Sequence, residues 1–167
     1  AVLSLRIQND KDAGLNKKHE VDPANSTVTF ARTFGFVANV LGMPAPRLFL
    51  RTDVQGGLTH MPVYPLASLS GATLLSGFQP SDLMFVAGRH LSDYRPEHYI
   101  RTMLKSNTEL KTVLMAGLRL SGVVPQVEPA AEQAAQQIAT KMQPAQRDAL
   151  RSLAKRFVDA GARTDIK

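Results

Sequence analysis

The residues best suited to chemistry are His90, Asp93 and His98, which follow one another within a short stretch of the chain. Imidazole and carboxylate groups bind zinc and transfer protons, and the chain has no cysteine that could supply a thiolate ligand. His90 and Asp93 are three residues apart, so on a helix they can share a face. His98 follows Pro96, so its direction is not tied to theirs, and His60 is expected on a sheet. The pattern leaves open whether His60, His90 or His98 binds a metal. A partly buried, hydrogen-bonded His90 explains it better, and we expect no metal.

Other catalytic patterns are incomplete. Gly71, Ser76 and Gly77 lack the spacing of a nucleophile elbow, which requires a glycine two residues on each side of the serine. There is no cysteine nucleophile, no phosphate-binding loop of the G-x-x-x-x-G-K-[ST] type and no G-x-G-x-x-G turn. We therefore expect no catalytic residue and no cofactor, and a protein that is not an enzyme.

Helices are expected on both sides of this stretch. The first is predicted over residues 26–42, with Ser26 as its N-cap, a terminating Gly42 and apolar residues at every third or fourth position. A second helix begins near Pro80, and Pro96 ends it or starts a further helical segment. Three more helices are predicted over residues 108–121, 129–142 and 144–160.

A small sheet is predicted between the first two helices. Short strands are expected over residues 48–50, 58–64 and 72–75, and Val2–Leu5 is a further strand candidate. Pro62 and Pro65 restrict the segment 58–64 to an edge strand or an irregular strand. Several helices packed against a small, mostly antiparallel sheet define an α+β fold.

Residues 74–93, LLSGFQPSDLMFVAGRHLSD, resemble the strand, turn and active-site helix of zinc peptidases of the minigluzincin type, domains found attached to helical-repeat bacterial proteins. In that family the helix carries H-E-x-x-H, in which two histidines hold zinc and the glutamate activates water. If Gly88 matches the family's glycine, Arg89 and Asp93 take the histidine positions and His90 takes the glutamate position. Arginine cannot ligate zinc, so the resemblance, which covers about residues 26–120, implies a peptidase-like domain without its metal site. Arg89 and Asp93 are expected to attract each other instead.

Length and composition fit one soluble globular domain. The chain has 167 residues, of which 44% are apolar and 20% charged. It has no apolar run of the roughly 20 residues that a membrane helix needs and no recognisable secretory leader, so we expect a cytoplasmic protein. We expect an N-terminal extension over residues 1–25, a peptidase-like core over 26–125 and a C-terminal helical segment of the same domain over 126–167. Ala1 in place of methionine suggests a fragment of a longer chain.

The net charge of +6 favours contact with an acidic partner. The last predicted helix carries a basic stripe, formed by Arg147, Arg151, Lys155 and Arg156. A solvated helix face explains this stripe most simply, and contact with nucleic acid or an anionic surface is the alternative.

Together these observations predict a protein-interaction or scaffolding domain. A peptidase-like fold without metal keeps an edge strand, which suits the capture of an extended segment of a protein partner. The candidate edge consists of Leu58, His60, Val63 and Tyr64. Two alternatives remain: a zinc peptidase with atypical ligands, and a binder of nucleic acid or an anionic surface through the basic stripe.

Overall fold

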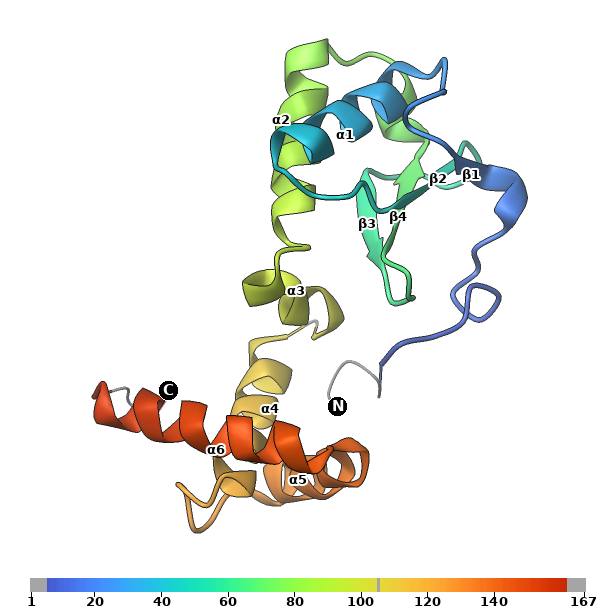
Figure 1. Cartoon of the computed structure of the whole chain (residues 1–167). Helices are drawn as coiled ribbons and strands as arrows, with labels where there is room; N and C mark the ends of the chain where they lie inside the picture. The colour runs from blue at the N-terminus through green and yellow to red at the C-terminus, as the bar shows by residue number, and fades with distance from the viewer. Residues whose placement is uncertain (1–5, 105, 162–167) are drawn as a thin grey trace. The chain divides into compact units, whose positions relative to one another are not determined.

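The computed structural model describes residues 6–104 and 106–161 and has an α+β fold, as the sequence predicts. The chain divides into two compact units, one of residues 7–103 and the other of residues 104–167 with residues 1–6. This boundary follows Met103, whereas the sequence placed the start of the C-terminal helical segment near residue 126. The strand candidate Val2–Leu5 lies outside the described residues. Figure 1 shows the sheet and its helices in one unit and a separate group of helices in the other.

A four-stranded mixed sheet forms the centre of the first unit (Figure 1). Its strands lie in the order β1 (Glu20–Val21), β2 (Arg47–Arg51), β4 (Ala67–Gly71) and β3 (Leu58–Met61). The outer pairs are antiparallel and the central pair, β2 with β4, is parallel. The prediction that residues 58–64 form an edge strand is confirmed, although the strand ends at Met61.

The two faces of the sheet bury different partners, because successive side chains of a strand point to opposite sides. On one face Leu48 packs with apolar residues of α1 (Thr29–Val40) and α2 (Pro80–Ser92). On the other face Phe49 packs with Leu15 of the N-terminal segment. The residues that α1 buries recur three or four positions apart, as predicted: Phe30, Ala31, Phe34, Val37 and Ala38.

The prediction that Ser26 caps the first helix is wrong. The helix begins at Thr29, and its N-cap, Val28, makes no side-chain capping bond. The Ser26 hydroxyl instead accepts a hydrogen bond of 3.1 Å from the backbone N–H of Val28. A serine hydroxyl that accepts a hydrogen bond from the N–H two residues later forms a local turn. Ser26 thus forms a turn just before the helix and does not cap it.

The prediction of a strand over residues 72–75 is also wrong. These residues form the short 3-10 helix η3 (Ala72–Leu75), and the strand β4 comes directly before it. The sequence of β4, Ala-Ser-Leu-Ser-Gly, has small residues that do not favour a strand. Its pairing with β2 on one side and β3 on the other therefore determines its structure. The short strand β1 likewise lies where the sequence predicted a loop.

Arg47 holds the N-terminal segment onto the sheet. Its guanidinium donates to both carboxylate oxygens of Asp10, at 3.0 and 2.8 Å, and to both of Glu20, at 2.8 and 3.1 Å. These hydrogen bonds hold the pKa of each carboxyl below its ordinary value, against the opposing effect of burial. Residues that the sequence assigned to a loose extension are thus tied to the core by charge-assisted hydrogen bonds.

The remaining helices match the predicted ranges to within two residues. The first unit ends with α3 (Pro96–Met103), and the second contains α4 (Asn107–Leu120), α5 (Pro129–Lys141) and α6 (Pro144–Asp159). Ala116, Ala135 and Ile138 form the apolar contact of α4 with α5. Among the helices that the structure describes, none is long and apolar enough to cross a membrane.

Candidate functional site

A polar cluster lies under α2, where this helix crosses the β3–β4 side of the sheet. His90 and Tyr94 come from α2 and the residues just after it, His60 from β3 and Ser68 from β4. His90 and Tyr94 are four residues apart and therefore face the sheet together. Ser68 is fully buried, and only 6% of His90 is exposed. Sequence reasoning found His90 but missed Ser68, whose signal is the serine at every second position of the strand Ala-Ser-Leu-Ser-Gly.

The hydrogen bonds of the cluster have a single consistent direction. Tyr94 Oη donates its proton to the carbonyl oxygen of Ala67, at 2.6 Å. The Ser68 hydroxyl, 2.9 Å from Tyr94 Oη, must then donate to it. Having used its proton, Ser68 accepts from Nε2–H of His90, which lies 2.9 Å from Ser68 Oγ. His90 is therefore a hydrogen-bond donor to this serine and not the base that would activate it.

His60 joins the edge strand to the same cluster. Its ring stacks on that of His90, with ring centres 3.7 Å apart and planes 10° from parallel. Its Nε2 donates to the backbone oxygen of His90, at 3.0 Å, and lies 3.9 Å from the Asp93 carboxylate. The edge strand is thus attached to α2 by side chains as well as to β4 by its backbone.

Burial shifts the pKa values of His90 and Tyr94. It lowers the pKa of His90 to about 3, with a smaller contribution from the positive charge that His60 can carry. Burial also raises the pKa of Tyr94, against the opposing effect of its bond with Ser68. At neutral pH both side chains are uncharged. The hydrogen bonds that link His90 to Ala67 through Ser68 and Tyr94 form a structural network that joins α2 to the sheet.

The expected attraction between Arg89 and Asp93 is not formed. The Asp93 carboxylate faces His60, and the Arg89 side chain is exposed, without an ion pair among the described residues. His98 lies exposed on α3, outside this cluster.

The resemblance places Arg89, His90 and Asp93 at the positions of the zinc-binding motif, but these residues do not fit a zinc site. Zinc needs three or four nitrogen, oxygen or sulfur ligands that converge. Arg89 has no lone pair to offer, and His90 uses its Nε2–H toward Ser68. Within the described parts of the chain, no three His, Asp or Glu side chains are grouped so that they could hold a metal ion.

The metal content of the purified chain provides a test. We expect no stoichiometric zinc in the natural sequence, and about one zinc per chain in an Arg89→His/Asp93→His variant, because this change places two imidazoles four residues apart next to His60. Elemental analysis measures both. Adding His60→Ala should reverse the gain. Stoichiometric zinc in the natural chain would contradict the absence of a metal site.

The predicted partner-binding edge is only partly present. Leu58 and His60 lie on β3, and Tyr64 is 75% exposed in the loop that follows. Val63 is completely buried in the core on the opposite face and has no side-chain surface to offer. Gln8 pairs with this end of the strand, donating its N–H to the Pro62 oxygen at 2.7 Å. The open edge is thus limited to β3 itself.

The backbone groups that β3 turns outward follow from its pairing. Gly71 N–H donates to the Gly57 oxygen at 3.1 Å, and the register continues as Leu58 with Ser70 and His60 with Ser68. In an antiparallel pair, residues alternate between facing the partner strand and facing away. Thr59 and Met61 therefore bond to β4, whereas the N–H and C=O groups of Leu58 and His60 point away from the sheet. Among the described residues, those four groups have no hydrogen-bond partner.

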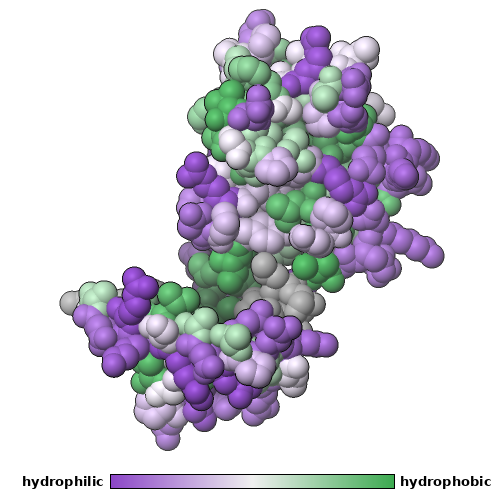
Figure 2. All heavy atoms as spheres, in the orientation of Figure 1, coloured by the Kyte–Doolittle hydropathy of each residue, from purple (hydrophilic) through white to green (hydrophobic). Residues whose placement is uncertain are grey.

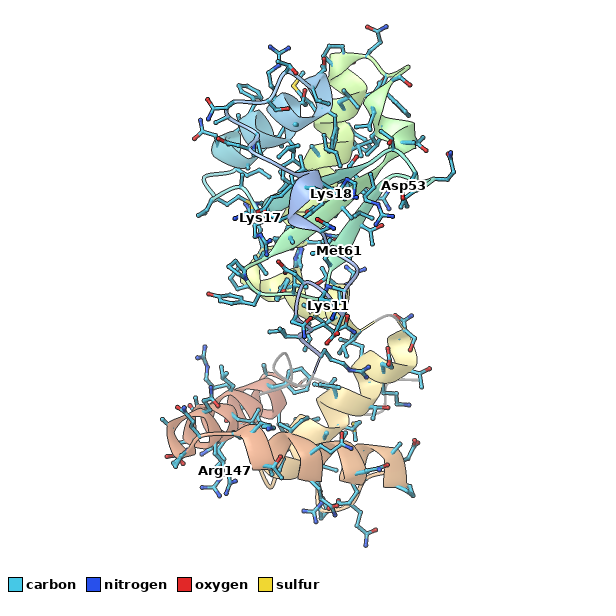
Figure 3. The ribbon with its side chains drawn as sticks, turned by 90° about the vertical axis from the view of Figure 1, so that its right-hand side faces the viewer. Lys11, Lys17, Lys18, Asp53, Met61 and Arg147 are labelled. Atoms are coloured by element: carbon cyan, nitrogen blue, oxygen red, sulfur yellow. The ribbon has the colours of Figure 1, made fainter. Side chains whose placement is uncertain are left out.

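The predicted basic stripe lies on α6, and its four residues, Arg147, Arg151, Lys155 and Arg156, are all exposed. Arg147 is labelled in Figure 3. Arg151 lies 3.6 Å from Asp148, one turn earlier on the same helix. A partly neutralised, solvated helix face accounts for this arrangement.

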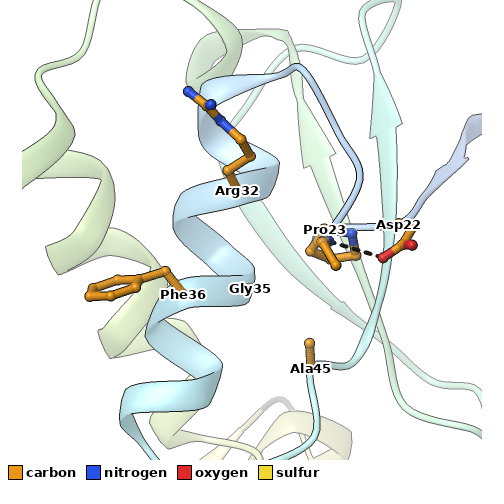
Figure 4. A pocket seen from close by; sticks show the side chains of 7 residues that line it. Asp22, Pro23, Arg32, Gly35, Phe36 and Ala45 are labelled. Carbon is orange, nitrogen blue, oxygen red and sulfur yellow. Dashed lines mark hydrogen bonds between the residues drawn. The ribbon is translucent and has the colours of Figure 1, made fainter.

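A second surface feature is formed by α1 and α2. Several apolar side chains of α1 and α2 are exposed there, among them Phe36, Val40, Met84 and Phe85, and Figure 2 shows green atoms between the purple ones on this unit. A cavity of about 360 Å³ is lined by α1 and by the turn at Asp22 (Figure 4). Asp22 accepts a hydrogen bond from Ala24 N–H within that turn, at 2.9 Å.

No protein-family model, no curated protein and no solved structure matches this chain. The resemblance to a minigluzincin without its metal site therefore stays a prediction.

Proposed function

We propose that residues 7–103 form a protein-interaction module that takes up an extended segment of a partner protein by strand addition at the outer edge of β3. One observation carries this proposal: the outward N–H and C=O groups of Leu58 and His60 have no partner among the described residues. An unpaired edge is a template for another strand, because its backbone groups are already aligned.

The attachment of β3 supports the proposal. Strand addition needs an edge that is held in place before the partner arrives, since ordering it on binding would weaken the complex. The stack of His60 on His90 and the bond from His60 to α2 hold β3 in this way. The buried network beneath it leaves no acid, base or nucleophile for catalysis, which favours binding over an enzyme activity.

Amide hydrogen exchange measured by NMR tests the proposal. In the free chain we expect the amides of Leu58 and His60 to exchange fast and those of Thr59 and Met61 slowly. A peptide selected on the chain from a random heptapeptide library should slow the first two at least about tenfold and leave the other two unchanged. Selected peptides that leave Leu58 and His60 unprotected would show that they bind elsewhere.

Two substitutions of Leu58 distinguish the contribution of its backbone N–H to binding from that of its side chain. Leu58→Pro removes an outward N–H without breaking a bond to β4, as prolines can at a sheet edge. Leu58→Ala removes most of the same side chain and keeps the N–H. We expect the proline variant to bind the selected peptide about tenfold more weakly than the alanine variant, since one backbone hydrogen bond is lost.

A further inference from the structure

The charged residues on the side of α2 that borders the open edge indicate which side chains a partner segment carries. This inference rests on the proposed strand addition. Asp93 marks that side, because its carboxylate lies 3.9 Å from His60 on β3. The opposite side of α2 packs on α1, where Gly88 approaches Val37. Arg89 is one helical turn before Asp93 and therefore lies on the same side as Asp93.

Both charges on this side of α2 are available. The Arg89 guanidinium makes no hydrogen bond or ion pair with any residue that the structure describes, and among those residues the Asp93 carboxylate has one charge partner, His60 at 3.9 Å. Residues four apart with opposite charges usually pair on a helix, but these two remain separate. A partner that lies along β3 can supply an opposite charge for each.

The spacing of these charges matches that of a strand. Four residues of a helix rise about 6 Å. Two residues of a strand, which carry side chains on the same face, rise about 6.8 Å. Two side chains on one face of an added strand can thus meet Arg89 and Asp93 together.

The direction of α2 relative to β3 sets the order of the charges. His60 pairs with Ser68, which bonds to His90, and Met61 pairs with Ala67, whose oxygen accepts from Tyr94. The step from His60 to Met61 thus corresponds to the step from His90 to Tyr94. Strand β3 therefore runs in the same direction as α2. A strand antiparallel to β3 runs the opposite way and meets Asp93 before Arg89.

We infer that the segment added to β3 is antiparallel and carries Lys or Arg opposite Asp93, followed two residues later by Asp or Glu opposite Arg89. Antiparallel addition is chosen because antiparallel pairs are slightly more stable and more common. The ligand is thus an extended segment with a basic-x-acidic pattern on the face toward α2.

Two peptides of identical composition test the order of charges: Thr-Val-Lys-Val-Glu-Val-Thr and Thr-Val-Glu-Val-Lys-Val-Thr. We expect the first to bind the full chain roughly tenfold more tightly at low salt, because both charge pairs are attractive in one and repulsive in the other. The difference should shrink in high salt. Equal affinity, or preference for the second peptide, would overturn the inference.

The charge-swapped variant Arg89→Asp/Asp93→Arg keeps the net charge and should reverse the preference of the chain. Arg32→Asp, an exposed change on α1, should leave the natural preference unaltered. A swapped variant that is folded and still prefers the first peptide would contradict the assignment. If both peptides protect the Leu58 and His60 amides equally, only the charge assignment fails; if neither these peptides nor library peptides protect them, the proposed strand addition fails as well.

Discussion

Replacing Gly71 by alanine is expected to lower the free energy of unfolding of the first unit by about 3 kcal/mol. Gly71 ends β4, and a Cβ atom there would lie 2.6 Å from the Gly56 oxygen and 2.7 Å from the Val54 oxygen. Both are backbone atoms, so no side chain can move aside to relieve the clash. The turn that leads into β3 would have to shift, and with it the edge that we propose for binding.

Gly57 provides the matched control. A Cβ atom added at Gly57 meets nothing within 4 Å, although this glycine is the register partner of Gly71. We expect Gly57→Ala to change stability by less than about 0.5 kcal/mol. The measurement is urea unfolding followed by the near-ultraviolet signal of tyrosine, because all three tyrosines lie in residues 7–103. Equal stability of the two variants would show that the turn is not packed against β4 as described.

The stability of the first unit is expected to fall by about 2–3 kcal/mol between pH 7 and pH 4.5 because of His90 alone. Burial lowers the pKa of His90 to about 3 in the folded chain, whereas an unfolded histidine has a pKa near its ordinary value of 6.5. Between these values the unfolded chain binds the extra proton. The stabilisation is therefore fully present above pH 6.5 and is lost progressively as the pH falls toward 3.

His90→Gln isolates this effect from other titrating groups. Glutamine can still donate to Ser68 but does not titrate, so its stability should depend less on pH over the same range. Asp10 and Glu20 lose their bonds to Arg47 in both proteins at lower pH, so their contribution cancels in the comparison. Urea unfolding at several pH values gives the two slopes. Parallel slopes would mean that His90 is solvated in the folded chain.

The surroundings of the His90 ring account for its lowered pKa. Its ring is bounded by Ser68 and Tyr94 on the sheet side, by His60 in a stack and by Phe34 of α1, whose ring centre lies 6.3 Å away. A charge at this position would replace a neutral donor in close-packed surroundings, and within the described part of the chain no carboxylate forms a hydrogen bond or ion pair with the ring. This explains the direction of the pH dependence.

The helices could be predicted from the sequence because their signals are local. In α1 the apolar residues recur with the helical period, and in α2 a proline begins the helix at Pro80. Each helix forms its backbone hydrogen bonds within one segment, so a short window of sequence contains most of the information. The prolines after β3 similarly indicated an edge strand, and the missing motifs argued against catalysis.

The site depended on contacts between distant segments. Ser68 bonds to His90 and Tyr94, 22 and 26 residues further along the chain, and the alternating serines of its strand do not indicate these partners. Asp93 was expected to meet Arg89 on its own helix, yet it faces His60 on the neighbouring strand. Strand pairing is made by backbone groups of separate segments, and these pairings set which side chains come together. The sequence therefore determined where the helices lie, whereas the tertiary structure decided which backbone groups remained open among the described residues.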